Sequence, residues 1–223
     1  IEWTLPFSGV DLRFGFNPTT VKVAAVSSGW AEGRASLGSF TVNLANPTAI
    51  GGAAQLSGIS LAALVSASNL GGRLKMEGKV SGTVPFTSGA EGIRITNGRI
   101  AADGPGRLSI DRTLWTKGEP SANAVQDFAY QALENMAFES LTADLDSVAN
   151  GRLQIVFHIK GRSDPPKAQT ADIAISDIVD GTALQKPVPL PSGTPIDLTL
   201  DASLNFDELL KSYAEAWSNT LNP

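Results

Sequence analysis

Cysteine and histidine, two residue types that are common in catalysis and metal binding, are almost absent from this 223-residue chain. The chain has no cysteine, which excludes disulfides, thiolate zinc sites and cysteine nucleophiles. Its single histidine, His158, excludes metal sites that need several imidazole ligands. His158 stands on the polar side of an alternating stretch, and no serine or cysteine motif accompanies it. We therefore interpret His158 as a surface residue rather than a catalytic base.

Two pairs of aspartates have a spacing that invites comparison with glycosidases. Asp144 and Asp146 on one strand would lie about 6.6 Å apart, within the roughly 5–9.5 Å between glycosidase carboxylates. Asp197 and Asp201 would lie about 13 Å apart, which is too far. Both pairs alternate with apolar residues, a pattern typical of the solvated face of a strand. Because common catalytic and nucleotide-binding motifs are also absent, the sequence predicts no enzyme, no metal site and no cofactor.

The composition limits the possible partners. With 17 basic and 22 acidic residues, the chain has a formal net charge of −5, which argues against nucleic acid as a partner. It contains no run of about 18 apolar residues that could cross a bilayer as a helix. The chain starts at Ile1 rather than at methionine, so we expect a fragment of a longer protein, with targeting or anchoring parts upstream.

Alternation of apolar and polar residues is the dominant pattern, and it predicts strands. The clearest stretches are Arg73–Phe86, Arg152–Lys160 and Ile196–Leu204. One apolar and one polar face are typical of antiparallel sheets that are wet on one side. We expect the apolar faces of these three stretches to line one continuous surface. Shorter strands are predicted at 12–16, 21–26, 36–44 and 107–110.

Two Asn-Gly pairs predict hairpins, because this pair favours tight turns between strands. Asn97-Gly98 would join strands 92–96 and 99–101, and Asn150-Gly151 would join strands 139–148 and 152–160. Helices are predicted at 60–68, at 121–136 and from 206 to about 218. In the last helix Asn205 would cap the N-terminus, and Leu209, Leu210, Tyr213 and Trp217 would dock on the sheet. The stretch 160–195 reads as a loop with a possible strand at 172–175.

These long strands allow two arrangements. Their apolar faces can form the closed core of a sandwich or of a sheet with helices packed on it. Alternatively, the sheet can curl into a groove whose apolar inner face holds acyl chains. The residues alone leave both arrangements open.

Several short segments follow one another in a characteristic order between about residues 56 and 217. They are GKVSGTVPF at 78–86, GIRI and NGRI at 92–95 and 97–100, GPGRL at 104–108, the segment 124–141 ending in FESL, GRLQI at 151–155, IDLTL at 196–200 and FDELL at 206–210. In this order they resemble the YdbH-like proteins, a branch of the AsmA-like envelope proteins of Gram-negative bacteria. The Pro165-Pro166 pair and the long stretch that follows depart from the family pattern, which affects that loop only.

The resemblance implies the C-terminal periplasmic region of an envelope protein that is anchored in the inner membrane by an N-terminal helix. Members of the family extend across the periplasm as a β-rich groove and are implicated in moving phospholipid between the two membranes. The C-terminal end is similar to the part that pairs with a small outer-membrane lipoprotein, by strand addition. An older family label, dicarboxylate transport, finds little support in these residues.

We therefore expect a single domain over residues 1–223. It would be mainly β, a curved and mostly antiparallel sheet that forms an elongated groove, with two or three short helices packed on it. The alternative is a structural or partner-binding periplasmic module with a closed core and no lipid cargo. The residues expected to contact phospholipid acyl chains are Leu74, Met76, Val80, Val84, Phe86, Leu153, Ile155, Phe157, Ile159, Ile196, Leu198, Leu200 and Leu204.

Overall fold

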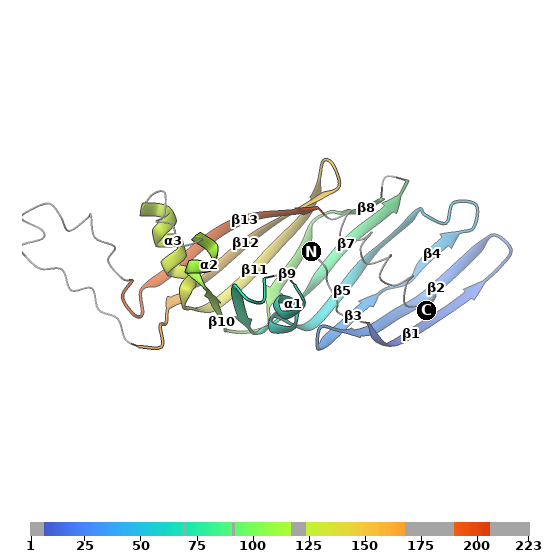
Figure 1. Ribbon diagram of the computed structural model, residues 1–223. Helices are drawn as coiled ribbons and strands as arrows, with labels where there is room; N and C mark the ends of the chain where they lie inside the picture. Colours follow the sequence, from blue (N-terminus) through green and yellow to red (C-terminus); the bar gives the residue numbers. More distant parts are fainter. Residues whose placement is uncertain (1–6, 69, 91, 117–123, 168–189, 206–223) are drawn as a thin grey trace, which may run out of the picture.

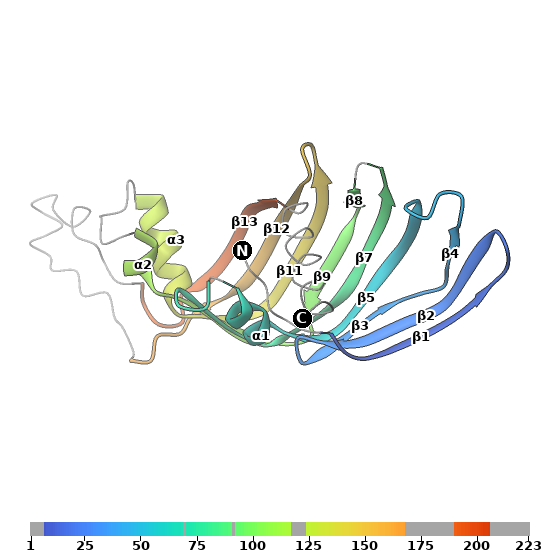
Figure 2. The same cartoon turned by 45° about the vertical axis from the view of Figure 1, so that its right-hand side comes forward.

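The chain forms a long, strongly curved β sheet with short helices that lie away from its N-terminal strands (Figures 1 and 2). A computed structural model describes residues 7–68, 70–90, 92–116, 124–167 and 190–205. Within these ranges thirteen strands belong to one sheet, and the neighbouring strands run antiparallel. The predicted fold class, a mostly antiparallel curved sheet with a few short helices, is confirmed.

The N-terminal strands form one end of the sheet. β1 (Ser8–Phe16) pairs with β2 (Thr20–Trp30), and the other side of β2 pairs with β3 (Gly33–Leu37) and β4 (Phe40–Asn43), which lie end to end. β3 then pairs with β5 (Ile50–Ser60). The strand predicted at 36–44 corresponds to the end of β3 and to β4, and only its continuity is wrong, because residues 38 and 39 separate the two strands.

The longest predicted strand is divided into two. β6 (Leu74–Glu77) and β7 (Lys79–Gly89) are separated by Gly78, whose φ of +127° is a backbone conformation that side chains disfavour. β6 pairs only with β10 (Gly106–Ile110), whereas β7 pairs with β5 on one side. The glycine thus redirects the chain and gives the two halves different neighbours.

The first predicted hairpin is wrong. β8 (Gly92–Ile95) and β9 (Gly98–Ala102) do not pair with each other; both pair with the same side of β7, one after the other. Asn97 adopts the left-handed φ of 54° that a turn would need, but here it marks an irregularity between two nearly collinear strands. The chain reverses instead between Gly89 and Gly92.

The C-terminal part of the sheet is the most regular. β11 (Met136–Val148) pairs with β9 and β10 on one side and along its length with β12 (Arg152–Ser163) on the other. The predicted hairpin between β11 and β12 is confirmed, and Asn150 and Gly151 have φ values of 63° and 67°. β13 (Pro195–Asn205) pairs with β12 through eleven consecutive residues and closes this end.

Three helices belong to the described residues: α1 (Leu61–Ala67), α2 (Arg112–Thr116) and α3 (Ala124–Glu134). The helix predicted at 60–68 is confirmed as α1, with Ser60 as its N-cap. Met136 was expected in a helix but begins β11, and α2 was not predicted. The predicted strand at 172–175 and the predicted helix at 206–218 lie outside the described residues.

Candidate functional site

The register of the sheet places the three predicted apolar stretches on one face, as expected. Residues that are paired across antiparallel strands point to the same side of a sheet. Ile159 pairs with Leu198 and Phe157 with Leu200, so the apolar positions of β12 and β13 share a face. The chain of pairs Phe157–Ala143, Ala143–Ile100 and Ile100–Gly82 extends this face to β7. Met76 joins it through Leu108 and Met136.

One row of this face crosses eight strands without a charged residue. Its members are successive cross-strand partners, and only the first, Ser28, is polar. Because neighbouring strands lie about 4.8 Å apart, seven steps make the row roughly 34 Å long along the curved sheet. The row consists of Ser28, Ala35, Leu56, Gly82, Ile100, Ala143, Phe157 and Leu200.

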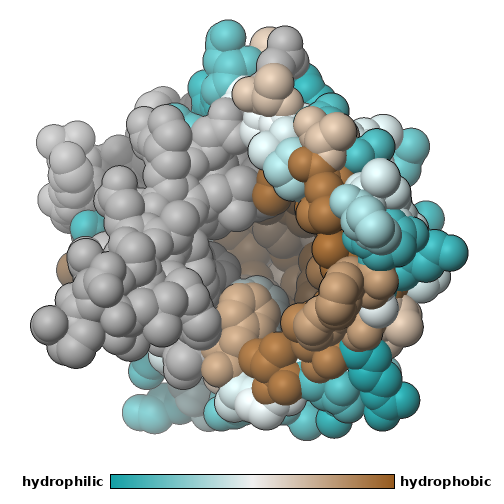
Figure 3. Space-filling view, turned by 90° about the vertical axis from the view of Figure 1, so that its right-hand side faces the viewer, coloured by the Kyte–Doolittle hydropathy of each residue, from teal (hydrophilic) through white to brown (hydrophobic). Residues whose placement is uncertain are grey.

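The apolar face lies on the inside of the curve. Figure 3 looks into the molecule from the β1 end and shows a hollow; where its wall is coloured, most of the residues are hydrophobic, and hydrophilic residues lie outside. The charged residues of the long strands take the opposite positions, as Arg99, Asp144 and Lys160 do. The sheet therefore separates an apolar interior from a charged exterior.

The thirteen residues predicted to contact acyl chains all fall on this inner face, and they divide into two clusters. One cluster lies beneath α1 and α3 and includes Val80, Ile159 and Ile196, which are at most 4% exposed. The second includes Leu153, which is 4% exposed, together with Val84, Phe86, Ile155 and Leu204. Phe157 contacts both clusters. Nine of the thirteen side chains, all but Val80, Leu153, Ile159 and Ile196, are only half-buried.

The inner-face residues at the N-terminal end are not among the thirteen residues predicted from the sequence. These form what we call the N-terminal apolar patch, in which the β1 residues are exposed and the β2 and β4 residues pair with one another. The signal was present in the sequence, because Leu12, Phe14 and Phe16 alternate with Arg13 and Gly15. The patch consists of Leu12, Phe14, Phe16, Val21, Val23, Phe40 and Val42.

The residues first examined for chemistry lie on the outer face. Asp144 Oδ1 and Oδ2 lie 3.8 Å from Arg99 Nε and from His158 Nε2, respectively. His158 Nδ1 lies 3.2 Å from Thr199 Oγ1, so four strands contribute to one polar row. The Arg99, Asp144 and His158 side chains are 44–72% exposed, which is the environment of a solvated strand face. This row links neighbouring strands and is open to water.

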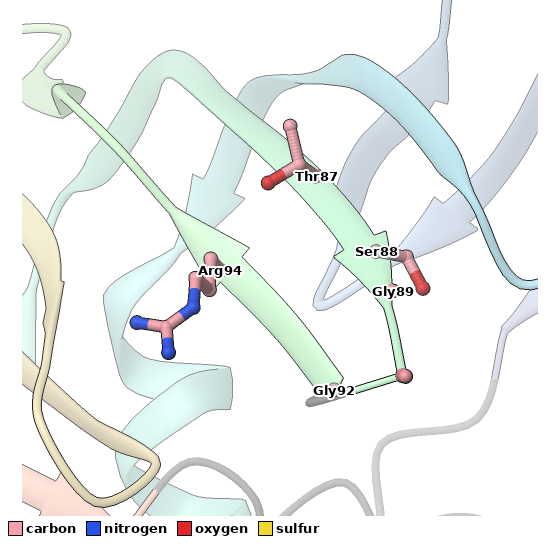
Figure 4. A pocket seen from close by; sticks show the side chains of 6 residues that line it. Thr87, Ser88, Gly89, Gly92 and Arg94 are labelled. Carbon is pink, nitrogen blue, oxygen red and sulfur yellow. The ribbon is translucent and has the colours of Figure 1, made fainter.

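A small cavity among the described residues has too little volume for a lipid. It has a volume of about 180 Å³ and lies at the tip of the β7–β8 hairpin, lined by Thr87, Ser88, Gly89, Ala90, Gly92 and Arg94. In Figure 4 the Thr87 and Arg94 side chains extend to one side of the hairpin and Ser88 to the other. The polar groups therefore do not converge on one ligand.

The described residues offer neither a metal site nor a membrane-spanning helix. In the ranges given above, no group of three or more potential metal ligands was found. In the same part of the chain, no helix is long and apolar enough to cross a membrane.

Comparison with known proteins adds one finding. The family model described as "YdbH-like: Intermembrane phospholipid transport protein YdbH" matches residues 5–213, which is nearly the whole chain. No curated protein and no solved structure matches the chain.

Proposed function

The chain belongs to the YdbH-like family of intermembrane phospholipid transport proteins, and from this premise we propose that it is a lipid-binding groove segment. The observation that carries the proposal is the uncharged inner face, which follows the curve of the sheet across eight strands. Apolar contact of this kind is non-directional and contributes about 25 cal/mol per Å² of buried area. Such a surface holds acyl chains without selecting a headgroup and lets them move along the row.

In this proposal the thirteen predicted residues form the wall and floor of the groove. The nine half-buried residues contact acyl chains, and the four buried ones, Val80, Leu153, Ile159 and Ile196, support them from below. The groove works by binding and transfer, so it needs no catalytic residue, metal or cofactor. It lies in the periplasm, as part of a protein anchored in the inner membrane and reaching toward the outer membrane.

A charge on the wall tests this role. Ile155→Asp and Leu198→Asp each place a carboxylate on the inner face, where acyl chains cannot solvate it. Native mass spectrometry of the purified chain should find phospholipid on the parent protein and much less on these variants. Thr199→Asp is the matched control, because it adds the same charge on the outer face, one residue away from Leu198. A parent protein without bound phospholipid would contradict the proposal.

The partner in this proposal is a small outer-membrane lipoprotein that adds a strand to β13. β13 pairs with β12 along eleven residues without a register shift, and no described strand occupies its other edge. A long, regular, unpaired edge is a template for strand addition. Photo-crosslinking residues placed along 196–204 should capture such a lipoprotein in envelope extracts. Capture only from other strands would argue against this edge.

A second candidate function rests on the deep burial at the helical end. Ala132 and Met136 have no exposed surface, and Phe138 is 1% exposed, as in a closed core. These values favour a structural or partner-binding module that carries no lipid. The Ile155→Asp variant separates the two candidates, since a closed core would lose thermal stability whereas a lipid-lined groove would lose lipid at nearly unchanged stability.

A further inference from the structure

Two pairs of strands lie end to end in the sheet, and both pairs are joined to it in the same way. β3 and β4 pair one after the other with β2, and β8 and β9 pair one after the other with β7. In each pair only one strand continues the sheet on its other side, β3 with β5 and β9 with β11. Among the described strands, β4 and β8 have one partner each. The sheet is therefore interrupted between β4 and β5 and between β8 and β11 (Figure 2).

The interruption between β8 and β11, which we call the seam, lies between Gly92–Ile95 and the end of β11. The pairing of β9 with β11 stops at Gly98 and Leu145, and within the described strands no pair continues it toward the tip of β11. β8 and β11 nevertheless lie close to each other. Because no backbone ladder has to break, separating these two strands costs less free energy than separating neighbours elsewhere in the sheet.

Two side chains of β11 take the place of the missing ladder. Ser147 Oγ accepts a hydrogen bond of 2.9 Å from the Ile95 N–H, and Asp146 Oδ1 accepts one of 2.7 Å from the Asn97 N–H. Ser147 pairs with Leu153 and so belongs to the inner face, whereas Asp146, the residue before it, belongs to the outer face. The seam is therefore closed by one side-chain hydrogen bond from each face of the sheet.

Apolar packing opposes opening of the seam on its inner side. Ile95 is 6% exposed and belongs to the second buried cluster, together with Ala143, Leu145 and Leu153. Separating β8 from β11 in an empty groove would expose this apolar cluster to water, which costs free energy. An acyl chain on the inner face offers the same kind of contact as the cluster. Bound phospholipid would therefore lower the cost of opening and shift the equilibrium toward the open seam.

We infer that Asp146 and Ser147 form a latch across the seam, which stays closed while the groove is empty and opens when phospholipid occupies it. The response to phospholipid rests on the proposed function, whereas the latch itself does not. The ladder between β9 and β11 remains paired and acts as the hinge. Opening moves β8 and the adjoining end of β7 away from β11, which widens the groove beside Phe86, the partner of Ile95.

Amide hydrogen exchange of the full 223-residue chain, followed by NMR, tests the latch without lipid. Ser147→Ala should speed exchange of the Ile95 amide about tenfold, equivalent to about 1.4 kcal/mol, because a partly buried N–H loses its acceptor. The amide of Ile100, in the paired strand β9, should exchange at an unchanged rate. Ser140→Ala is the matched control, because Ser140 is exposed on the same strand and pairs with Lys160, away from the seam.

The second half of the latch is tested in the same way. Asp146→Ala should speed exchange of the Asn97 amide, whose acceptor it removes. Asp144→Ala is its matched control, because the Asp144 carboxylate lies next to side chains rather than a backbone N–H. Equal acceleration at the seam and at Ile100 would mean that a variant loosens the whole sheet. Unchanged exchange at Ile95 and Asn97 would mean that these hydrogen bonds do not hold the seam. Either result would overturn the latch.

Monomeric dihexanoylphosphatidylcholine, added to the parent protein below its critical micelle concentration, tests the response to lipid. It should speed exchange at Ile95 and Asn97 but not at Ile100, and native mass spectrometry of the same sample shows whether lipid is bound. Bound lipid with unchanged or slower exchange at the seam would overturn the opening by lipid. Absence of bound lipid would overturn the proposed function and with it the lipid response, while a latch measured in the lipid-free variants would stand.

Discussion

Phe14 and Phe138 have the same side chain on the same face of the same sheet, yet they occupy opposite environments. Phe14 in β1 is 60% exposed, whereas Phe138 in β11 is 1% exposed. The difference lies in what covers the sheet. α3 packs on β10 and β12, and α1 packs on β6, whereas none of the three described helices has extensive contacts with β1 or β2. Figures 1 and 2 show these helices away from the β1 end.

The same alternation of apolar and polar residues serves folding at one end of the sheet and leaves an apolar surface open at the other. Where a helix covers the inner face, burial of apolar area is gained when the protein folds and contributes to its stability. Where the face stays open, the same free energy is not yet gained, so it remains available for binding a ligand. The alternation of residues sets which side of the sheet is apolar, and the covering elements decide which of these two uses applies.

The largest difference between the two ends should appear on truncating these two phenylalanines. Phe138→Ala should lower the free energy of unfolding by about 3–5 kcal/mol, because the ring is fully buried and leaves a cavity. Phe14→Ala should cost much less than that, because its ring is already in contact with water. Denaturant unfolding measures both. Equal losses at the two positions would break the distinction between a covered and an open end.

The link between the two ends depends on close contact in the middle of the sheet. Gly82 lies in the eight-residue row, and a Cβ added there would lie 2.2 Å from the backbone oxygen of Arg99. Gly82→Ala should therefore push β7 and β9 apart and cost about 1–3 kcal/mol, the usual cost of overpacking. Gly89→Ala is the control, since no atom lies within 4 Å of its added Cβ. Thermal unfolding of the two variants measures the difference, and similar melting temperatures would contradict it.

Much of the fold could be predicted from the sequence, because alternation and turn chemistry are local. The strand 152–160 and the Asn150-Gly151 turn lie close to where the pattern placed them. The shared face of the three stretches follows from the alternation within each strand, which puts every second residue on the same side. Asn97-Gly98 has the same pair of residues but does not turn the chain, because β7 is long enough to pair with both β8 and β9. Pairing with a distant strand prevents the hairpin here, and a local sequence pattern carries no information about distant strands.

The candidate site was predictable in part for the same reason. The alternation of apolar and polar residues assigned Ile155, Phe157 and Leu198 to one face, but it does not distinguish a half-buried residue from one that lies under a helix. Ile159 and Leu198 are neighbours in the sheet, yet Ile159 is fully buried and Leu198 only half-buried. Phe14 and Phe16 lie in a stretch whose predicted strand covered only residues 12–16, and only the three longest alternating stretches were assigned to the groove.

The N-cap of α1 should contribute measurably to the stability of the protein. Ser60 is 5% exposed, and its hydroxyl oxygen accepts a hydrogen bond of 3.2 Å from the N–H of Ala63, at the N-terminus of α1. Ser60→Ala should cost about 1 kcal/mol, because the first turn of the helix loses this partner. Ser66→Ala, at an exposed position in the same helix, is the control and should change stability little. A cost at Ser66 as large as at Ser60 would show that α1 is not held by its cap.

The smallest expected effect concerns α2 and depends on pH. The pKa of Asp111 lies below its ordinary value of 3.8, chiefly because the Thr113 hydroxyl donates a hydrogen bond to the carboxylate. The N–H groups of Leu114 and Thr113 add to this effect at the start of α2, and burial opposes it. A pKa that is lowered on folding means that the ionised carboxylate stabilises the folded state. This contribution is complete above the unfolded pKa and is lost as the pH falls through the folded pKa.

Amide hydrogen exchange at Thr113 and Leu114 measures this contribution locally. At about pH 5 the amides should exchange faster in Asp111→Ala than in the parent protein, and this difference should shrink as the pH falls through the folded pKa and the parent carboxyl becomes protonated. Because Asp111 is fully exposed, the change should stay within α2 and leave the exchange of the buried strands unaltered. A difference that persisted unchanged at low pH would mean that the side chain acts through its shape rather than its charge. In that case the stability of α2 would not respond to acid through the charge of Asp111.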